Sequence, residues 1–226
     1  MEGSWLFRKG DGPEETVAIP HTWNAVDGQD GGNDYWRGVG SYRKSFQAPG
    51  FDPDSERVIL WFDGVSESAK VFLNGEETAA HDGGYSGFGV DITDALKEGE
   101  NTLEVWADNS VNDRVYPQKA DFTFYGGIYR PVFLKIVPRW RFDGGKYGGS
   151  GIRISPKISG KNAEVSVTSW IQGGGEISAY ISDPEGKKVS RTVRVKVDEK
   201  GGSDPGSSGK LEVELPPMTI KNVHLW

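Results

Sequence analysis

The stretch VYPQKADFTFYGGIYRPVFL, residues 115–134, decides how the rest of this 226-residue sequence is interpreted. It combines several aromatic residues, a single carboxylate at Asp121 and the pair Gly126-Gly127, and then continues into the apolar run 132–137. A short apolar run bounded by turn residues is typical of a buried strand. The sequence therefore predicts a loop that a buried strand anchors at one end, and loops held by a rigid sheet commonly carry binding residues.

Asp121 and the aromatic residues that follow it, Phe122, Phe124 and Tyr125, have the chemistry of a sugar contact. A carboxylate accepts hydrogen bonds from hydroxyl groups, and aromatic rings cover the C–H face of a pyranose. The alternative is that Asp121 caps a turn while the aromatic rings fill the interior of a β-sandwich. The residues alone leave both interpretations open.

The composition indicates an all-β protein. The sequence contains 32 glycines, 8 tryptophans, 8 tyrosines and 10 phenylalanines, with few long helical patterns, which is typical of a fold with many turns. It contains no cysteine, which excludes a disulfide framework, a thiolate nucleophile and a cysteine-based zinc site. The formal net charge of -7 argues against a nucleic-acid or anionic-membrane partner and is compatible with a neutral sugar.

The sequence predicts neither a membrane-spanning helix nor a secretory signal. Its apolar runs are all shorter than the ~18 residues that a membrane span needs. The N-terminus, MEGSWLF, lacks a basic region followed by an apolar stretch. We therefore expect a cytoplasmic protein, although prior removal of a signal peptide would leave the same sequence.

The strand pattern predicts two β-sandwich domains, 1–138 and 139–226. In the first domain, residues 57–63 are apolar on both faces, as in the central strand of a sheet, and Asn74-Gly75 is a strong hairpin signal. Residues 138–151 carry five glycines and little periodicity, which is typical of a linker.

The second predicted domain has the pattern of an immunoglobulin-like sandwich. Its five short strands are expected at residues 152–158, 163–171, 177–181, 192–197 and 211–215. Such a sandwich normally has about seven strands. We therefore expect this domain to be incomplete, with an unpaired sheet edge and exposed apolar surface.

Five further stretches occur in the same order as in one known family. They are PHTWNAVDG (20–28), YWRG (35–38), VFLNG (71–75), HDGGY (81–85) and GENTL (99–103). Together with DFTFYGGIYR (121–130), they resemble the N-terminal sugar-binding domain of family 2 glycoside hydrolases, the relatives of β-galactosidase, β-glucuronidase and β-mannosidase. The resemblance covers about 140 residues and looks closest to the β-galactosidase branch. It implies a jelly-roll, galactose-binding-like sandwich for residues 1–138.

The resemblance also implies the residues that contact substrate. In the family, the aspartate at the position of Asp121 reaches into the active site and holds hydroxyls of the sugar in the cleavage subsite. The resemblance likewise implies that Asn33 or Asp34, in a Gly-rich loop at the active-site rim, contacts the same sugar. The alternative for Asn33 and Asp34 is ordinary Asx-turn chemistry.

The sequence lacks the features of a catalytic domain. Family 2 enzymes carry their two catalytic glutamates on a (β/α)₈ barrel, which needs roughly 250 residues and a repeating strand–helix pattern. Neither feature is present, so we expect no catalytic residue in this chain. We also expect no metal and no cofactor, because the three histidines lack metal-ligand spacing, the acidic loop 27–34 lacks the EF-hand pattern, and no phosphate loop or dinucleotide fingerprint occurs.

Other conspicuous residues have simpler interpretations. Trp23 and Trp36 could stack on a sugar, but a core or interdomain role is the better prediction. Arg37 is expected to pair with a carboxylate rather than with a ligand. His21, which follows Pro20, is expected to order its loop.

The sequence thus predicts the N-terminal, non-catalytic fragment of a β-galactosidase-like hydrolase, inactive alone, that shapes the active-site pocket. Its expected partners are a galactoside or related sugar and the catalytic barrel of the parent chain, and the resemblance allows a homo-oligomeric parent. Three alternatives stay open: a free-standing carbohydrate-binding module, a fragment of a β-glucuronidase or β-mannosidase relative, and a purely structural sandwich pair that serves oligomer contacts.

Overall fold

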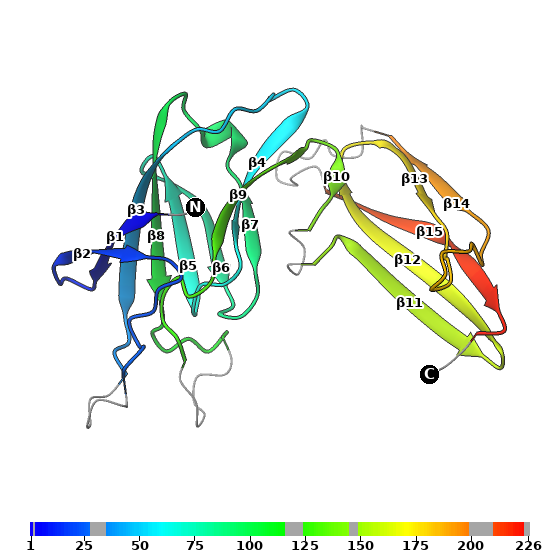
Figure 1. Ribbon diagram of the computed structural model, residues 1–226, viewed down its shortest axis with the longest axis horizontal. Helices are drawn as coiled ribbons and strands as arrows, with labels where there is room; N and C mark the ends of the chain where they lie inside the picture. Colours follow the sequence, from blue (N-terminus) through cyan, green and yellow to red (C-terminus); the bar gives the residue numbers. More distant parts are fainter. Residues whose placement is uncertain (2, 28–34, 116–123, 145–148, 199–209, 224–226) are drawn as a thin grey trace. The chain divides into compact units, whose positions relative to one another are not determined.

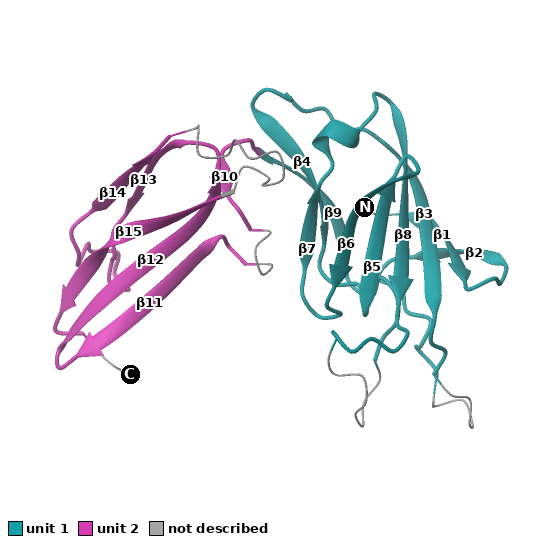
Figure 2. Ribbon diagram, turned by 180° about the vertical axis from the view of Figure 1, so that it is seen from behind, with its two compact units in different colours: residues 1–137 teal, residues 138–226 magenta. Residues whose placement is uncertain are grey.

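The computed structural model describes residues 1, 3–27, 35–115, 124–144, 149–198 and 210–223 (Figure 1). The chain divides into two compact units, residues 1–137 and 138–226, which Figure 2 colours separately. Within the described residues, regular structure consists of β-strands and a single 3-10 turn, η1 (Thr93–Ala95). The predicted all-β class is confirmed.

Unit 1 is a sandwich of two sheets. The larger sheet is antiparallel, with the order β2-β1-β3-β8-β5-β6, and the smaller one has the order β7-β4-β9. The strands of the larger sheet are β1 (Ser4–Lys9), β2 (Glu14–Ala18), β3 (Val39–Gln47), β5 (Ser68–Leu73), β6 (Glu76–Asp82) and β8 (Glu100–Asp108). Those of the smaller sheet are β4 (Glu56–Phe62), β7 (Phe88–Asp91) and β9 (Val132–Pro138).

The core of unit 1 follows from strict alternation along its strands. In β4, the side chains of Val58, Leu60 and Phe62 are fully buried, and β8 buries Leu103 and Val105 in the same way. Successive side chains of a strand point to opposite faces, so each strand contributes every second residue to the space between the sheets. Each such side chain stabilises the fold by ~1.5–3 kcal/mol relative to exposure. The predicted central position of β4 is confirmed.

The hairpin between β5 and β6 has the predicted turn. Asn74 and Gly75 both adopt positive φ, 53° and 88°, as a type I′ turn requires. The Asn74 side chain also reaches β8, where its Oδ1 accepts a hydrogen bond from the Thr102 amide at 3.0 Å and its Nδ2 donates to Asn101 Oδ1 at 2.9 Å. This residue therefore shapes the turn and ties it to the neighbouring strand.

The prediction of a buried strand after the Gly-Gly pair is wrong in one respect. Residues 132–138 form β9, but only Val132 is buried, while Phe133 and Ile136 are 41% and 44% exposed. β9 is an edge strand with β4 as its one neighbour in the sheet. An apolar run is buried on both faces only where a second layer covers each face, and the core of unit 1 covers one face of β9, fully at Val132 and partly at Leu134.

Unit 2 is a smaller sandwich. Its main sheet contains β10 (Arg141–Phe142), β11 (Ile152–Ser159), β12 (Asn162–Gln172) and β15 (Lys210–Lys221), and its second sheet pairs β13 (Gly175–Ala179) with β14 (Val193–Val197). A small cluster of buried residues, Val165, Val167, Val193, Leu215 and Met218, forms its core. The specific immunoglobulin-like topology stays a prediction.

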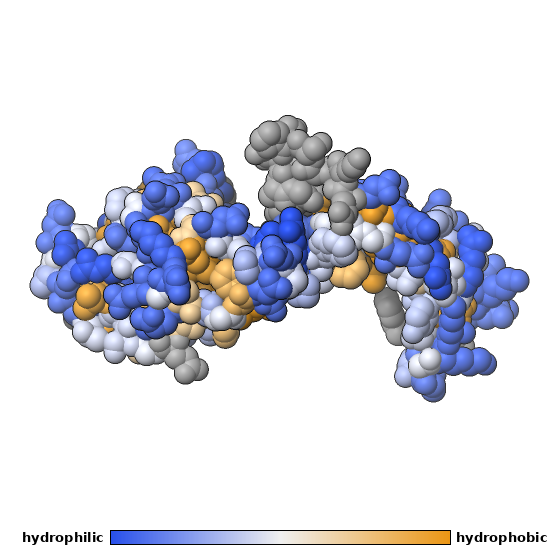
Figure 3. Space-filling view, turned by 90° about the horizontal axis from the view of Figure 1, so that it is seen from above, coloured by the Kyte–Doolittle hydropathy of each residue, from blue (hydrophilic) through white to orange (hydrophobic). Residues whose placement is uncertain are grey.

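Strand β11 leaves apolar side chains exposed. Ile154 pairs with Val167 of β12 and therefore shares the face that carries the core, yet it is 64% exposed. In the view of Figure 3, apolar surface is interspersed with hydrophilic surface. None of the described residues forms a helix long and apolar enough to cross a membrane.

Candidate functional site

The predicted sugar contacts Asp121, Asn33 and Asp34 lie outside the described residues. The residues that flank both segments are described, and Figure 1 shows these flanks at the same end of unit 1, opposite η1. We call the two flanks the stems: residues 24–27 with 35–38, and residues 109–115 with 124–127. The site can therefore be built from what holds the stems together.

Asn24 is the residue that joins the two stems. It is fully buried, and its Nδ2 donates to Asp27 Oδ2 at 2.5 Å and to the Trp36 carbonyl at 3.2 Å. Its Oδ1 accepts hydrogen bonds from the Gly126 amide at 2.8 Å and from Asn109 Nδ2 at 3.2 Å. One side-chain amide thus spans both stems with all of its hydrogen-bonding capacity in use.

Asn109, at the end of β8, completes the connection. Its Nδ2 also donates to the Trp36 carbonyl at 3.1 Å, and its Oδ1 accepts from the Gly38 amide at 2.9 Å. Arg37 donates to the Asn109 carbonyl at 3.0 Å. We call Asn24, Asp27 and Asn109 the amide cluster. Buried polar groups that are fully hydrogen-bonded rigidify their surroundings, so the cluster defines the geometry from which both segments leave the sheet.

Glycine is required where the second stem passes Asn24. A Cβ atom on Gly126 would lie 2.5 Å from the Trp23 ring and 2.6 Å from Asn24 Oδ1. Gly127 has φ +116°, and a Cβ there would lie 2.5 Å from the Tyr42 hydroxyl oxygen. The Gly-Gly pair therefore allows a close approach of the backbone to the aromatic core.

The aromatic residues near the stems are divided between interior and surface. Trp23 is 8% exposed, stacks on Phe7 with ring centroids 5.8 Å apart, and contacts Trp36 edge-on. The predicted core role of Trp23 is therefore confirmed. Phe124 is buried, whereas Tyr125 is 47% exposed. Of the aromatic residues predicted to lie beside Asp121, Phe124 thus belongs to the interior and Tyr125 to the surface. Phe122 lies outside the described residues.

His21 packs into the same aromatic core. Its Nδ1 lies 2.8 Å from the Tyr42 hydroxyl, and its amide donates to the Ile128 carbonyl. Burial lowers the pKa of His21, with an opposing contribution from Glu15, and burial raises the pKa of Tyr42. Both groups are therefore neutral at pH 7, and the His21 backbone ties its loop to residue 128, as predicted.

A buried ion pair lies beside the amide cluster, and sequence reasoning missed its acid. Arg37 Nη1 lies 3.9 Å from Glu67 Oε1, and Glu67 is 1% exposed. Within the described residues, neither carboxylate oxygen of Glu67 accepts a hydrogen bond. Burial raises the pKa of Glu67, Arg37 lowers it, and the Asp108 carboxylate raises it further. The prediction that Arg37 pairs with a carboxylate is confirmed.

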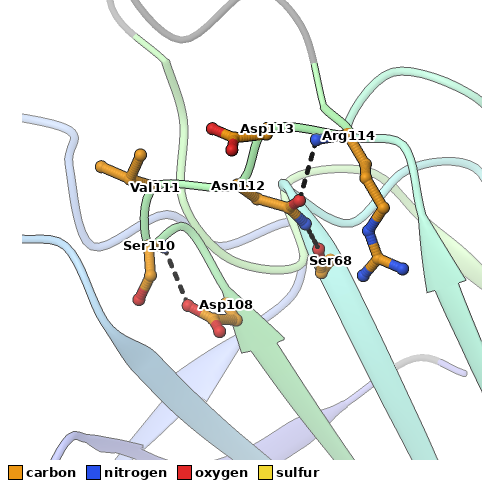
Figure 4. A pocket seen from close by; sticks show the side chains of 7 residues that line it. All are labelled: Ser68, Asp108, Ser110, Val111, Asn112, Asp113 and Arg114. Carbon is orange, nitrogen blue, oxygen red and sulfur yellow. Dashed lines mark hydrogen bonds between the residues drawn. The ribbon is translucent and has the colours of Figure 1, made fainter.

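An open pocket of about 580 Å³ lies at the start of the second stem (Figure 4). Ser68 and Asp108, at the ends of β5 and β8, form one side, and residues 110–114 form the rest. The Ser110 amide donates to Asp108 Oδ1 at 2.8 Å, and Asn112 Nδ2 donates to Ser68 Oγ at 3.0 Å. These bonds hold the loop against the sheet, so the pocket has fixed walls.

The acidic loop at residue 27 has a structural role where it is described. Asp27 Oδ2 accepts from Asn24 Nδ2 and from the Trp36 amide at 3.1 Å, which closes the first stem. Among the described residues, no group of three His, Cys, Asp or Glu side chains lies close enough to hold a metal ion.

Comparisons with known proteins agree with this arrangement. The sequence model of "Glycosyl hydrolases family 2, sugar binding domain" matches residues 25–138, which is half of the chain and contains both stems except Asn24. A β-glucuronidase of Bacteroides fragilis is 34% identical over 238 aligned residues, which cover 100% of this chain and 32% of that protein. A β-galactosidase of Thermoanaerobacter pseudethanolicus is 31% identical over 201 residues, covering 85% of this chain and 26% of that protein.

Solved structures lead to the same family. A crystal structure from Bacteroides fragilis, provisionally named a β-galactosidase, superposes with a TM-score of 0.81 and 34% identity, covering 100% of this chain and 36% of that one. The chain thus spans about a third of the length of the relatives it matches. Because the family's domain model matches residues 25–138 and the similarity to family members extends along the whole of this chain, this chain belongs to glycoside hydrolase family 2 and aligns with the N-terminal part of its members.

Proposed function

We propose that this chain is the non-catalytic, sugar-binding part of a family 2 β-glycosidase and shapes one wall of the pocket in which the glycosidic bond is cleaved. The observation that carries the proposal is the amide cluster, in which Asn24 bonds to both stems at once. A protein that must present side chains from two separate loops to one small sugar needs their bases in a fixed relation, because orientation errors of 1 Å lower catalytic rates strongly.

In this proposal Asp121 orients the sugar in the cleavage subsite, and Asn33 or Asp34 contacts the same sugar from the other segment. A carboxylate there accepts hydrogen bonds from two hydroxyl groups, and such bonds accelerate the reaction where they strengthen in the transition state. The catalytic glutamates belong to a barrel outside this chain. Residues 139–226, with an immunoglobulin-like fold, connect the sugar-binding domain to that barrel. The cytoplasmic location and a homo-oligomeric parent stay predictions.

The glycone that we propose is a neutral β-galactoside. Arg37 and Arg114, which lie in the stems, already have carboxylate partners: Arg37 lies 3.9 Å from Glu67, and Arg114 lies 2.8 Å from Asp82. A uronate needs a cation whose charge is not already balanced by a neighbouring carboxylate, and the charges of these two are balanced, although N–H groups of Arg114 remain exposed to solvent. This pairing supports a sugar without a negative charge.

A β-glucuronide is the second candidate. It is favoured by the names of similar proteins, since the relatives from Bacteroides fragilis and Formosa agariphila are called β-glucuronidases. The residues that would bind a uronate carboxylate then lie on the barrel. Measuring hydrolysis of 4-nitrophenyl β-galactoside and 4-nitrophenyl β-glucuronide by the full-length protein separates the two candidates.

The proposal is tested by Asp121→Ala in the full-length protein. We expect kcat/KM for the preferred 4-nitrophenyl glycoside to fall ~10²–10³-fold, with most of the loss in kcat, because a preorganised transition-state contact is removed. Asp94→Ala, an exposed aspartate of η1 at the opposite end of unit 1, is the matched control and should leave the kinetics unchanged. Unchanged kinetics in Asp121→Ala would instead favour a purely structural sandwich pair.

A further inference from the structure

The pocket of Figure 4 belongs to the same loop as Asp121. The loop that contains both begins after Asn109 and ends before Gly126, and these two residues bond to the same atom, Asn24 Oδ1, at 3.2 and 2.8 Å. Asn109 and Gly126, the residues on either side of this loop, therefore lie at one point of the sandwich. The pocket is formed by the first five residues of the loop together with the ends of β5 and β8.

Several polar groups that line the pocket have no hydrogen-bond partner among the described residues. Asp108 engages Oδ1 with the Ser110 amide, and its Oδ2 has no hydrogen-bond partner among the described residues. The same holds, within the described part of unit 1, for the Ser110 hydroxyl and for both oxygens of Asp113. In Figure 4 the side chains of Ser110 and Asp113 extend from the loop, and Asp108 lies at the end of β8. The pocket thus offers two carboxylates and a hydroxyl to a ligand.

A cation donor and a small apolar surface complete the lining. Arg114 donates to Asp82 at 2.8 Å, while its side chain remains 75% exposed, so several of its N–H groups face solvent. Val111 is also 75% exposed. Acceptors, donors and a limited apolar contact at fixed positions are the requirements of a polyol, and a pocket of 300–1,000 Å³ is typical for a small ligand.

The charge balance argues against other ligand classes. Two carboxylates, Asp108 and Asp113, line the pocket, and the guanidinium of Arg114 already pairs with Asp82, so an anion such as phosphate or a nucleotide would meet net negative charge. A purely apolar ligand would desolvate unpaired carboxylates at a large cost. A neutral sugar hydroxyl can donate to a carboxylate and accept from a guanidinium, and it suffers neither penalty.

We propose that this pocket is a subsite for the leaving-group sugar of an oligosaccharide, adjacent to the sugar that Asp121 contacts. This proposal rests on the proposed function of the chain, since it assigns the second sugar of the same substrate. It makes Ser110, Asp108 and Asp113 specificity-determining residues: they bind hydroxyl groups that a disaccharide has at this position and that an aryl leaving group lacks.

The experiment compares two substrates in the full-length protein, a β-linked disaccharide and the 4-nitrophenyl glycoside with the same glycone. For the double variant Ser110→Ala/Asp113→Ala, we expect the ratio of kcat/KM for the disaccharide to kcat/KM for the aryl glycoside to fall about tenfold, because two hydrogen bonds to the leaving-group sugar are lost. Asp113→Asn alone should lower the ratio less, since an amide oxygen still accepts. Asp94→Ala, outside the pocket, should leave the ratio unchanged.

Other outcomes separate the two proposals. An unchanged ratio in the double variant, or an equal loss on both substrates, overturns the leaving-group subsite while the proposed function stands. Failure of the unaltered protein to hydrolyse either substrate overturns the proposed function and this inference with it. Activity of the double variant on the aryl glycoside shows that the variant is folded, so a loss confined to the disaccharide cannot come from unfolding.

Discussion

At the scale of single residues, one buried amide connects the parts of unit 1 that carry the proposed site. Asn24 uses both its donor and its acceptor atoms, and the bonds reach Trp36 on one stem and Gly126 on the other. Hydrogen bonds of this kind contribute modestly when they are made and cost much more when one partner is removed, because the remaining groups stay buried without water. Asn24 is therefore expected to matter to stability as well as to geometry.

Asn24→Ala should lower the free energy of unfolding of unit 1 by about 3 kcal/mol. The Gly126 amide loses its acceptor, while Asn109 and Asp27 each lose one of their bonds. Urea denaturation followed by tryptophan fluorescence measures the change. The control is Asn162→Ala, an exposed position of β12, which should change stability by less than about 0.5 kcal/mol. An equal effect of both variants would show that the amide cluster does not hold the stems.

At the scale of secondary-structure elements, local turn chemistry sets the register of the larger sheet. The Asn74-Gly75 turn joins β5 to β6, and Asn74 adds a bond to Thr102 in β8. Register determines which side chains of a strand face the core, since a shift by one residue exchanges the two faces. The turn therefore helps to place Val71 and Leu73 in the interior.

Gly75→Ala should destabilise unit 1 by about 1 kcal/mol. A Cβ atom there meets no other atom within 4 Å, so the cost is the strain of an L-residue at φ 88°. Gly50→Ala is the matched control, because Gly50 also has open space around its Cβ position and lacks a positive φ. Differential scanning calorimetry measures both. A lower melting temperature in Gly50→Ala than in Gly75→Ala would contradict the role of the turn.

At the scale of the whole molecule, the chain corresponds to one part of longer proteins. It spans about a third of the length of its relatives, and the described stems lie at one end of unit 1. Contacts from one wall of a site hold a sugar weakly, since a small ligand must offset the loss of its translational and rotational freedom.

We therefore expect that galactose causes no saturable chemical-shift changes in this chain alone at tens of millimolar. The signals to follow by NMR are those of Asp121, Asn33 and the rings of Phe124 and Tyr125. The same titration with glucuronic acid tests the second candidate glycone. Saturable shifts centred on those residues would show that the domain binds sugar by itself, and the free-standing carbohydrate-binding module would become the better interpretation.

Periodicity, turn residues and motif order were sufficient to predict the all-β class, the central strand β4, the Asn74-Gly75 hairpin and the family. These features are local, because alternation, turn residues that adopt positive φ and short motifs can each be recognised within a few consecutive residues. The assignment of Asp121, Asn33 and Asp34 as sugar contacts came from the resemblance and stays a prediction, since these residues lie outside the described ranges.

Tertiary structure decided the features that depend on distant segments. Asn24 and Asn109 are 85 residues apart and meet only when β8 and the first stem lie side by side. Glu67 is buried where its backbone bonds to Gly83 and to Asp108 of β8 and its carboxylate pairs with Arg37, and these partners are distant in the sequence. β9 leaves Phe133 and Ile136 exposed although its sequence is apolar, because burial depends on which layers cover a strand, and the sequence of a strand does not specify its neighbours.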